Sequence, residues 1–192
     1  MNKEEKLKIT KDKLLEASAM LMENNDDPMK VTSREIAKAA GVQPAMINYC
    51  FGSREDLIYL TFAKIYNDYL KNADVEAILK EDLTPKDLLK RMHFVVVDCL
   101  VKHFNFTKAI TNFVLFKRDL SQESFSYPYV MKHYAGRKTE EECKLIAYEL
   151  STMMQLIIFR KEDIKRDFGI DLDNEDELRK YIDMRVDLLL GE

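Results

Sequence analysis

The sequence predicts an all-α fold with an N-terminal three-helix unit and a larger C-terminal helical domain. Only five Gly and four Pro occur in 192 residues, which favours long helices over a sandwich or barrel. Apolar side chains recur at helical spacing along most of the chain. Hydrophobic content of 46% and charged content of 33% describe a folded globular chain.

The first helix is expected over residues 5–24, because the run Asn-Asn-Asp-Asp-Pro that follows stops a helix. Residues 31–56 then contain the signals of two short helices joined by a tight turn. Thr32 and Glu35 have the spacing of a capping box, Gly41 suits the end of the first short helix, and Pro44 suits the start of the second. This order is that of a helix-turn-helix, although an ordinary helical hairpin has the same spacing.

The second short helix, over residues 43–50, has an outward face that suits the major groove of DNA. If Ile47 points inward, a rotation of about 100° per residue places Ala45 and Tyr49 nearly opposite it, with Met46 and Asn48 on the flanks. Asn can pair with an adenine edge, and small apolar side chains can contact a thymine methyl. The face is therefore expected to read bases.

Several stretches of this region also resemble a known protein family. REIAKAAGV and INYCFGSREDL, preceded by KLLEASAMLM, resemble the N-terminal domain of the TetR family of bacterial transcriptional regulators over residues 11–60. Two positions depart from the family pattern. Asn24 and Asn25 stand where a Gly usually closes the first helix, and Gln43 stands where Ser or Thr often follows Gly-Val.

Charge is distributed in a way that suits a local DNA surface on an acidic chain. The net charge is −4, but residues 30–54 hold four basic residues against Glu35 alone. Ser53 is an expected N-cap, and Arg54 in the next turn is expected to contact a phosphate, as the resemblance also implies. The residues expected at DNA are Lys30, Thr32, Ser33, Arg34, Gln43, Ala45, Met46, Asn48, Tyr49, Ser53 and Arg54.

The rest of the chain also has helical periodicity. Helices are expected over residues 57–72, 86–103, from 105 to about 118 with Phe116 inward, 138–159 and 174–190. The helix over residues 86–103 has an almost continuous apolar surface and is expected to be central and buried. Residues 121–135, with Pro128 inside them, are expected to be irregular, and a loop is expected to run through residues 168–169. We place the DNA-binding domain at residues 1–52 and the effector-binding and dimerisation domain at residues 53–192.

The last two long helices are more apolar than a surface helix requires, so they are expected to form a homodimer as a four-helix bundle, unless they complete an intrachain core. The resemblance implies the same interface. The residues expected there are Leu150, Met154, Ile157, Ile158, Ile182, Val186 and Leu189.

Aromatic and Met side chains of the central helices describe either an apolar ligand pocket or an ordinary core. The resemblance implies a small-molecule effector between these helices. The residues expected to line its pocket are Met92, Phe94, His103, Phe104, Phe113, Phe116, Tyr127, Tyr134 and Met153.

Other classes of function lack a signal. The three His residues and the three widely spaced Cys residues form no metal or catalytic pattern, and nucleotide-binding and hydrolase motifs are missing. We therefore expect no enzyme activity, no cofactor and no metal. No apolar run approaches the roughly 18 residues of a membrane span, and the N-terminus lacks a signal core, so a cytoplasmic location is expected.

The resulting hypothesis is a homodimeric repressor that binds a near-palindromic double-stranded operator and is released by a small-molecule effector. Two alternatives remain open. One is a helix-turn-helix protein without effector control that acts through a protein partner. The other is an all-α enzyme or carrier with an incidental helical hairpin.

Overall fold

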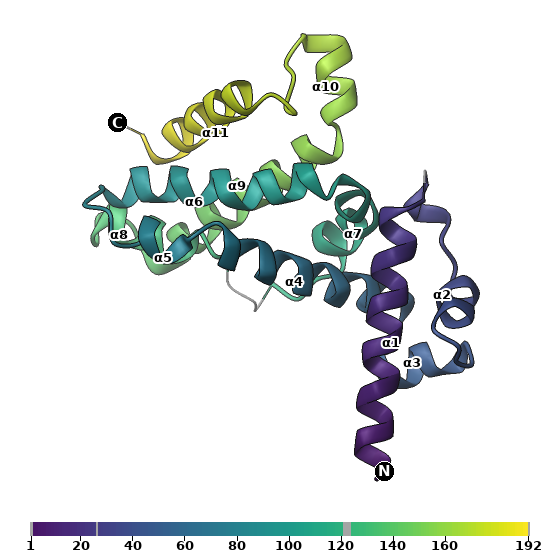
Figure 1. The fold of residues 1–192 in the computed structure, drawn as a ribbon. Coiled ribbons are helices and arrows are strands. Elements are labelled where there is room, and N and C mark those ends of the chain that lie inside the picture. The colour runs from purple at the N-terminus through teal and green to yellow at the C-terminus, as the bar shows by residue number, and fades with distance from the viewer. Residues whose placement is uncertain (1, 26, 121–123, 192) are drawn as a thin grey trace. The chain divides into compact units, whose positions relative to one another are not determined.

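The structure is a computed structural model that describes residues 2–25, 27–120 and 124–191 (Figure 1). Within these ranges the regular elements are all helices, so the predicted all-α class is confirmed. In chain order they are α1 (Lys3–Glu23), η1 (Pro28–Lys30), α2 (Ser33–Ala39), α3 (Ala45–Phe51), α4 (Arg54–Asn72), α5 (Val75–Ile78), α6 (Pro85–Lys102), α7 (Phe104–Phe116), α8 (Tyr127–Tyr134), α9 (Glu140–Phe159), α10 (Lys161–Phe168) and α11 (Glu175–Leu190).

The chain forms two compact units. The first unit consists of Met1–Asp68 and His103–Phe116, and the second of Tyr69–Lys102 and Lys117–Glu192. The domain boundary predicted after residue 52 falls inside the first unit. The division into a DNA-binding domain and an effector-binding domain at that residue stays a prediction. The physical reason for the difference is packing: α7, far along the chain, lies against α1 and η1, within the first unit.

The core of the first unit joins α1, α2, α3 and α4. α1 packs against both α2 and α3, and one apolar side chain from each element is fully buried: Leu14, Ile36, Ile47 and Leu57. Burial of side chains of this size stabilises the fold by roughly 1.5–3 kcal/mol each. α7 adds aromatic contacts, since Phe106 lies 6.2 Å from Phe62, ring centre to ring centre. The two short helices are therefore held on a wider helical base.

The second unit is organised around α6, as its nearly continuous apolar surface predicts. α6 packs against α8, α9 and α11. Leu89 and Val97 of α6 are fully buried, and so are Val130 of α8, Leu150 of α9 and Val186 of α11. The apolar faces of α9 and α11 thus contribute to a core within the chain.

Two segments differ from their predictions. Pro128 lies in the first turn of α8, where a missing N–H costs no hydrogen bond, so residues 127–134 form a helix rather than an irregular segment. Residues 121–123 of that segment lie outside the described residues. α10 replaces the loop predicted before Gly169, with Asp163 paired to both Arg160 and Arg166 on its exposed side.

One predicted inward residue is also wrong. Phe116 is the last residue of α7, and 78% of it is exposed, because the helix ends there and its last side chain extends past the packed turns. α5 is a single short helix that periodicity did not predict, and Asp74 caps it by accepting a hydrogen bond from the Ala77 N–H.

Candidate nucleic-acid interface

The start of α2 has the predicted capping box. The Thr32 hydroxyl oxygen accepts a hydrogen bond from the Glu35 N–H at 3.3 Å, and the Thr32 N–H donates to the Glu35 carboxylate at 2.7 Å. These bonds satisfy two N–H groups that a helix start leaves without partners. They also hold the pKa of Glu35 below its usual value, with the bond from the Thr32 backbone as the largest cause. Ser33 and Arg34 follow in the first turn, so the cap determines where they lie.

The turn between α2 and α3 depends on Gly41. Its φ of +67° lies in the left-handed region, which side chains with a Cβ adopt at a cost. A Cβ at this position would meet no atom within 4 Å, so the requirement comes from the backbone conformation and not from space. The N–H of Val42 then donates to the carbonyl of Ala37 at 3.0 Å, which closes the turn. This bond and conformation fix the direction in which α3 leaves α2.

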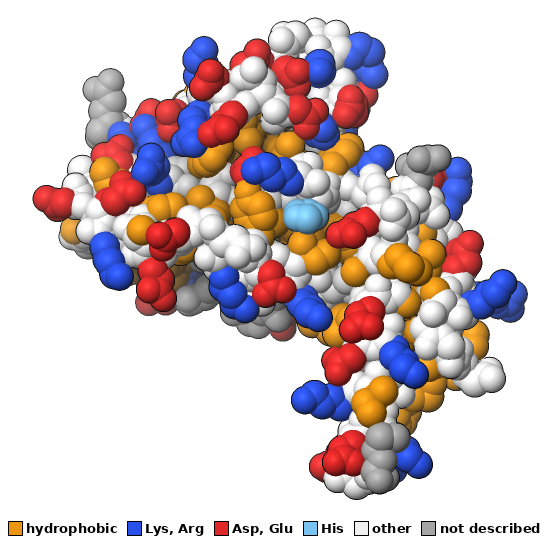
Figure 2. All heavy atoms as spheres, in the orientation of Figure 1, with side chains coloured by type: hydrophobic (Ala, Val, Ile, Leu, Met, Phe, Trp, Pro, Cys, Tyr) orange, Lys and Arg blue, Asp and Glu red, His pale blue; other side chains and the backbone are white. Residues whose placement is uncertain are grey.

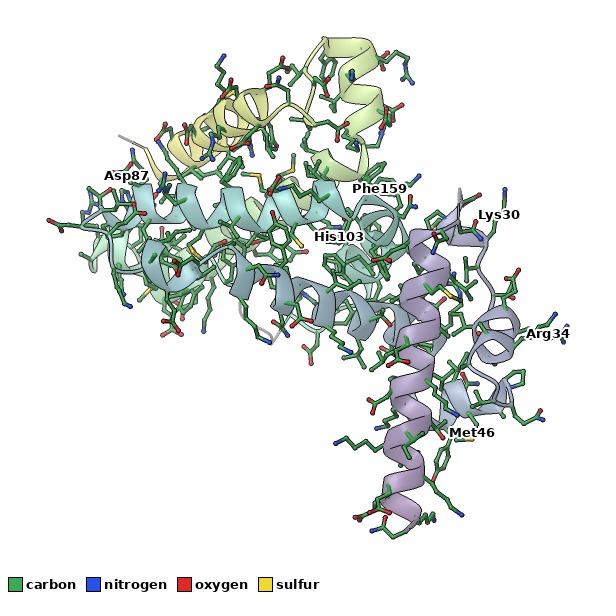
Figure 3. All side chains as sticks on the ribbon, in the orientation of Figure 1. Lys30, Arg34, Met46, Asp87, His103 and Phe159 are labelled. Atoms are coloured by element: carbon green, nitrogen blue, oxygen red, sulfur yellow. The ribbon has the colours of Figure 1, made fainter. Side chains whose placement is uncertain are left out.

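α3 presents the face that the sequence predicts. Ile47 is fully buried, whereas Ala45, Asn48 and Tyr49 are exposed, with 63% of Tyr49 accessible. Met46, which is labelled in Figure 3, is partly buried on the flank of the same helix. An exposed Asn on this face is a side chain of the kind that can pair with a base edge.

Basic side chains flank this helix within the first unit. Lys30 is paired with Asp27 at 2.9 Å yet its side chain remains 83% exposed, and that pairing raises its pKa. Arg34 is exposed on α2 and extends away from it (Figure 3). Lys38 and Gln43 are exposed as well. The exposed cations are placed to attract phosphates, which position a protein on DNA without reading its sequence.

Ser53 and Arg54 lie at the start of α4, and both side chains are hydrogen-bonded within the chain. The Ser53 hydroxyl caps the helix as predicted, accepting from the Asp56 N–H at 3.0 Å. The Arg54 side chain is directed back toward the chain, where its Nε–H donates to the carbonyl of Val31 at 2.6 Å. One terminal nitrogen also lies 3.4 Å and 3.3 Å from the carbonyls of Pro28 and Met29. The partners of Arg54 are thus three carbonyls of its own chain and the Glu55 carboxylate.

The structure does not bring the nine predicted effector residues into one compact unit. His103, Phe104, Phe113 and Phe116 belong to the first unit, and Met92, Phe94, Tyr127, Tyr134 and Met153 belong to the second. Several have partners of their own: Phe113 stacks 5.1 Å from Tyr59, and the Tyr134 hydroxyl donates to the carbonyl of Leu189. An effector pocket built from the whole set stays a prediction.

A hollow of about 350 Å³ lies on the second unit, and Phe94 is the predicted effector residue that lines it. The guanidinium of Arg179 lies 3.5 Å from the centre of the Phe94 ring. The other residues that line the hollow are mostly charged; they are Glu81, Leu83, Asp87, Lys90, Arg91, Ile182 and Asp183. Figure 2 shows acidic and basic side chains interspersed on the face that it draws. Among these residues, Lys90 pairs with Asp187, and Arg91 pairs with Glu81.

Four polar side chains cluster in the core of the second unit. The ring Nε2 of His93 lies 2.9 Å from the Ser126 hydroxyl, which lies 3.3 Å from that of Ser151, and Ser124 bonds to Ser151 in turn. Burial lowers the pKa of His93 to about 3. His93 and Ser126 resemble a base and a nucleophile, but both are buried, so no substrate can reach the pair as it stands. The sequence contains no signal that joins these residues.

Five of the seven predicted dimer residues are buried inside the chain: Leu150, Met154, Ile158, Ile182 and Val186. Side chains buried between α6, α9 and α11 cannot contact a partner, so the prediction for these five is corrected to an intrachain core. Ile157 and Leu189 are partly accessible. The apolar side chains that α9 and α11 expose are Leu145, Leu156, Phe159, Met184 and Leu188.

Three features of the described residues bear on metal binding, membrane spanning and thiol reactivity. Across residues 2–25, 27–120 and 124–191, no three His, Cys, Asp or Glu side chains are grouped to hold a metal ion. No helix in the same part of the chain has both the length and the apolarity that a membrane span requires. Burial raises the pKa of Cys50, which lies in α3, and this disfavours the reactive thiolate.

An all-helical protein in which a helix-turn-helix presents an exposed second helix belongs to a class that includes many DNA-binding regulators. Residues 14–59 match the family model described as "Bacterial regulatory proteins, tetR family". The chain is 30% identical over 124 residues to the "Probable HTH-type transcriptional regulator YttP" of Bacillus subtilis (strain 168), a match that spans 64% of this chain and 58% of that protein. The N-terminal domain, over residues 14–59, therefore matches the TetR family, as its resemblance indicates.

The fold of this chain matches that of a solved TetR-like structure over almost its whole length. A crystal structure of a TetR-like transcriptional regulator from Rhodococcus sp. RHA1 matches with a TM-score of 0.54 at 14% sequence identity. The match covers 95% of this chain and 97% of that one. At this identity the likeness concerns the fold, namely an N-terminal helix-turn-helix followed by a helical C-terminal part.

Proposed function

We propose that this chain is a homodimeric transcriptional regulator that represses a near-palindromic operator and is released by a small-molecule effector. The observation that carries the proposal is the outward face of α3. Ile47 anchors that helix in the first unit, and Ala45, Asn48 and Tyr49 are left exposed on it. Direct readout in the major groove needs such a face, since side chains must be exposed to reach base edges.

In this proposal, base reading and backbone binding belong to different residues. Gln43, Ala45, Met46, Asn48 and Tyr49 face bases, and Lys30, Thr32, Ser33 and Arg34 fix the register on phosphates. Exposure of Lys30, Arg34 and Gln43 supports this division. The Ser53 hydroxyl is engaged in its cap, so Ser53 contributes through its position at the start of α4.

Homodimerisation is proposed through the exposed sides of α9 and α11. Leu145 and Leu156 are eleven residues apart, which places them about 20° apart around α9. Met184 and Leu188 are four residues apart and so share one side of α11. A twofold dimer places two α3 helices about 34–36 Å apart on one face of the DNA, or at a longer spacing.

The experiment that tests this function is selection of bound duplexes from random double-stranded DNA, with the full chain as bait. A motif of two inverted half-sites is expected. Recovery of a single half-site contradicts the dimer, and recovery of no enriched sequence together with no retardation of duplex DNA at low salt contradicts DNA binding and favours an enzyme or carrier. A matched control is Asn48→Ala, which is expected to change the enriched base at one position of each half-site.

Effector release is tested on the duplex recovered by selection. Small molecules that stabilise the chain against thermal unfolding are expected to include one that weakens DNA binding, because an effector acts by its different affinities for two states. Ligands that stabilise the chain but leave DNA affinity unchanged contradict effector control and favour action through a protein partner.

A further inference from the structure

We infer that Arg54 is a positioning residue for the DNA-contacting segment and not a phosphate ligand. The inference rests on the proposed function, and it assigns Arg54 a role that differs from the phosphate contact expected from its place in the sequence. It follows from where the five N–H donors of the guanidinium are directed.

Four of these five donors have a partner within the first unit. The Nε–H donates to the Val31 carbonyl at 2.6 Å, and one terminal nitrogen reaches the carbonyls of Pro28 and Met29 at 3.4 and 3.3 Å. The other terminal nitrogen lies 3.4 Å from a carboxylate oxygen of Glu55. Since Arg has five such donors, one hydrogen remains for any further acceptor. A bidentate contact with a phosphate therefore cannot form without loss of these bonds.

The position of the side chain agrees with an internal role. Only 19% of the Arg54 side chain is exposed, whereas 83% of the Lys30 side chain is. A cation in the first turn of α4 also lies near the positive end of that helix, which is unfavourable on its own. The carbonyls of Pro28, Met29 and Val31 offset this cost, because they accept hydrogen bonds from the guanidinium.

The three carbonyls belong to the segment that presents the proposed DNA contacts. Pro28 and Met29 lie in η1, and Val31 directly precedes Thr32, the N-cap of α2. Arg54 thus joins the start of α4 to the segment that contains Lys30 and leads into α2, where Arg34 lies. Its planar fork spans three acceptors, and the single ammonium of Lys cannot reproduce that geometry.

The closing experiment compares Arg54→Ala, Arg54→Lys and Arg34→Ala on the duplex recovered by selection. Dissociation constants are measured from low to high salt, well below each variant's unfolding midpoint, where a residue that only stabilises the fold leaves affinity unchanged. Both Arg54 variants are expected to bind roughly tenfold more weakly or worse, since hydrogen bonds to a charged group are lost. Their salt slope is expected to equal that of the wild type.

Arg34→Ala is the matched control, because removal of a phosphate contact flattens the salt slope by about one unit. If Arg54→Ala flattens the slope in the same way, or if Arg54→Lys restores wild-type affinity, Arg54 is a phosphate ligand and the inference is wrong. Arg54→Lys keeps the charge, so it decides the question even if Arg54→Ala fails to fold.

A second readout requires no DNA. Amide hydrogen exchange of Lys30 and Val31, whose N–H groups donate to Asp27 and Pro28, is expected to become roughly tenfold faster in both Arg54 variants. Amides of α11, in the second unit, serve as the internal reference. Unchanged exchange at Lys30 and Val31 contradicts the inference. A wild-type chain that binds no duplex contradicts the proposed function instead, and the exchange measurement still tests Arg54.

Discussion

The imidazole of His93 and the hydroxyl of Ser126, 33 residues apart in the chain, meet at 2.9 Å inside the second unit. The Phe125 ring lies 4.7 Å from that imidazole, centre to centre, and Nδ1 on its other side is buried with no hydrogen-bond partner in the described part of the chain. Such a site accepts a neutral ring and penalises a charged one. Protonation of His93 is therefore coupled to unfolding of this core.

Acid is expected to destabilise the fold through His93. Its pKa is lowered to about 3 in the folded chain by desolvation, against 6.5 for an ordinary His. The folded state therefore binds fewer protons, and stability that is present above pH 6.5 is lost as the pH falls toward 3. Between pH 6.5 and 5 this amounts to about 2 kcal/mol.

The measurement is urea unfolding of the wild type and His93→Gln across that pH range. Gln does not titrate, so the variant is expected to lose about 2 kcal/mol less over the interval than the wild type. The comparison uses the change with pH, and a lower stability of the variant at every pH does not affect it. Identical pH dependence in both proteins contradicts a buried neutral His93.

Loss of the cap on α2 is expected to destabilise the first unit. Thr32→Ala removes the hydroxyl that accepts from the Glu35 N–H, at a cost of about 1 kcal/mol. Thr32→Ser keeps the acceptor and is expected to restore most of the stability. Thr10→Ala serves as control, because the Thr10 hydroxyl donates to the carbonyl of Lys6 in an exposed part of α1, and a change within about 0.5 kcal/mol is expected.

Base preference is expected to depend on Asn48. Its side chain is exposed on α3 beside Tyr49, and loss of an amide contact to a base edge costs roughly 1–3 kcal/mol at one position of the site. Competition binding with duplexes that differ at single positions measures this. Arg34→Ala is expected to weaken all duplexes alike. A uniform loss for Asn48→Ala, without a change in preference, removes Asn48 from the base-reading residues.

Oligomeric state is expected to depend on exposed residues of α11. Met184→Asp combined with Leu188→Asp is expected to reduce the mass in solution from a dimer to the 22.5 kDa chain, as measured by sedimentation. Both side chains are exposed, so the unfolding free energy of the monomer is expected to change little.

Lys180→Gln lies on the exposed surface of the same helix and is expected to leave the mass unchanged. A double variant that remains dimeric shows that the interface lies elsewhere. Leu150→Asp is not an alternative test, because Leu150 is fully buried in the second unit and its substitution disrupts the core.

Local signals predicted the helix-turn-helix closely. The Thr32 cap, the Gly41 turn and the burial of Ile47 each follow from interactions between residues within a few positions of one another. Periodicity likewise predicted a buried α6. It did not predict α10, whose side chains are mostly charged, since its pairs of Asp163 with Arg160 and Arg166 require knowledge of the helix before they can be recognised.

By itself, the sequence determined the all-α class, the TetR-like character of the N-terminal domain and the face of α3, because each depends on spacing along the chain. Tertiary structure decided which apolar faces are covered and which donors are used. Leu150 and Val186 have the pattern of an interface but lie in a core, because α6 covers them. Arg54 has the place of a phosphate ligand, yet its guanidinium is directed to carbonyls more than twenty residues earlier in the chain. Spacing along a helix reports which residues share a side, and only packing reports what lies against that side.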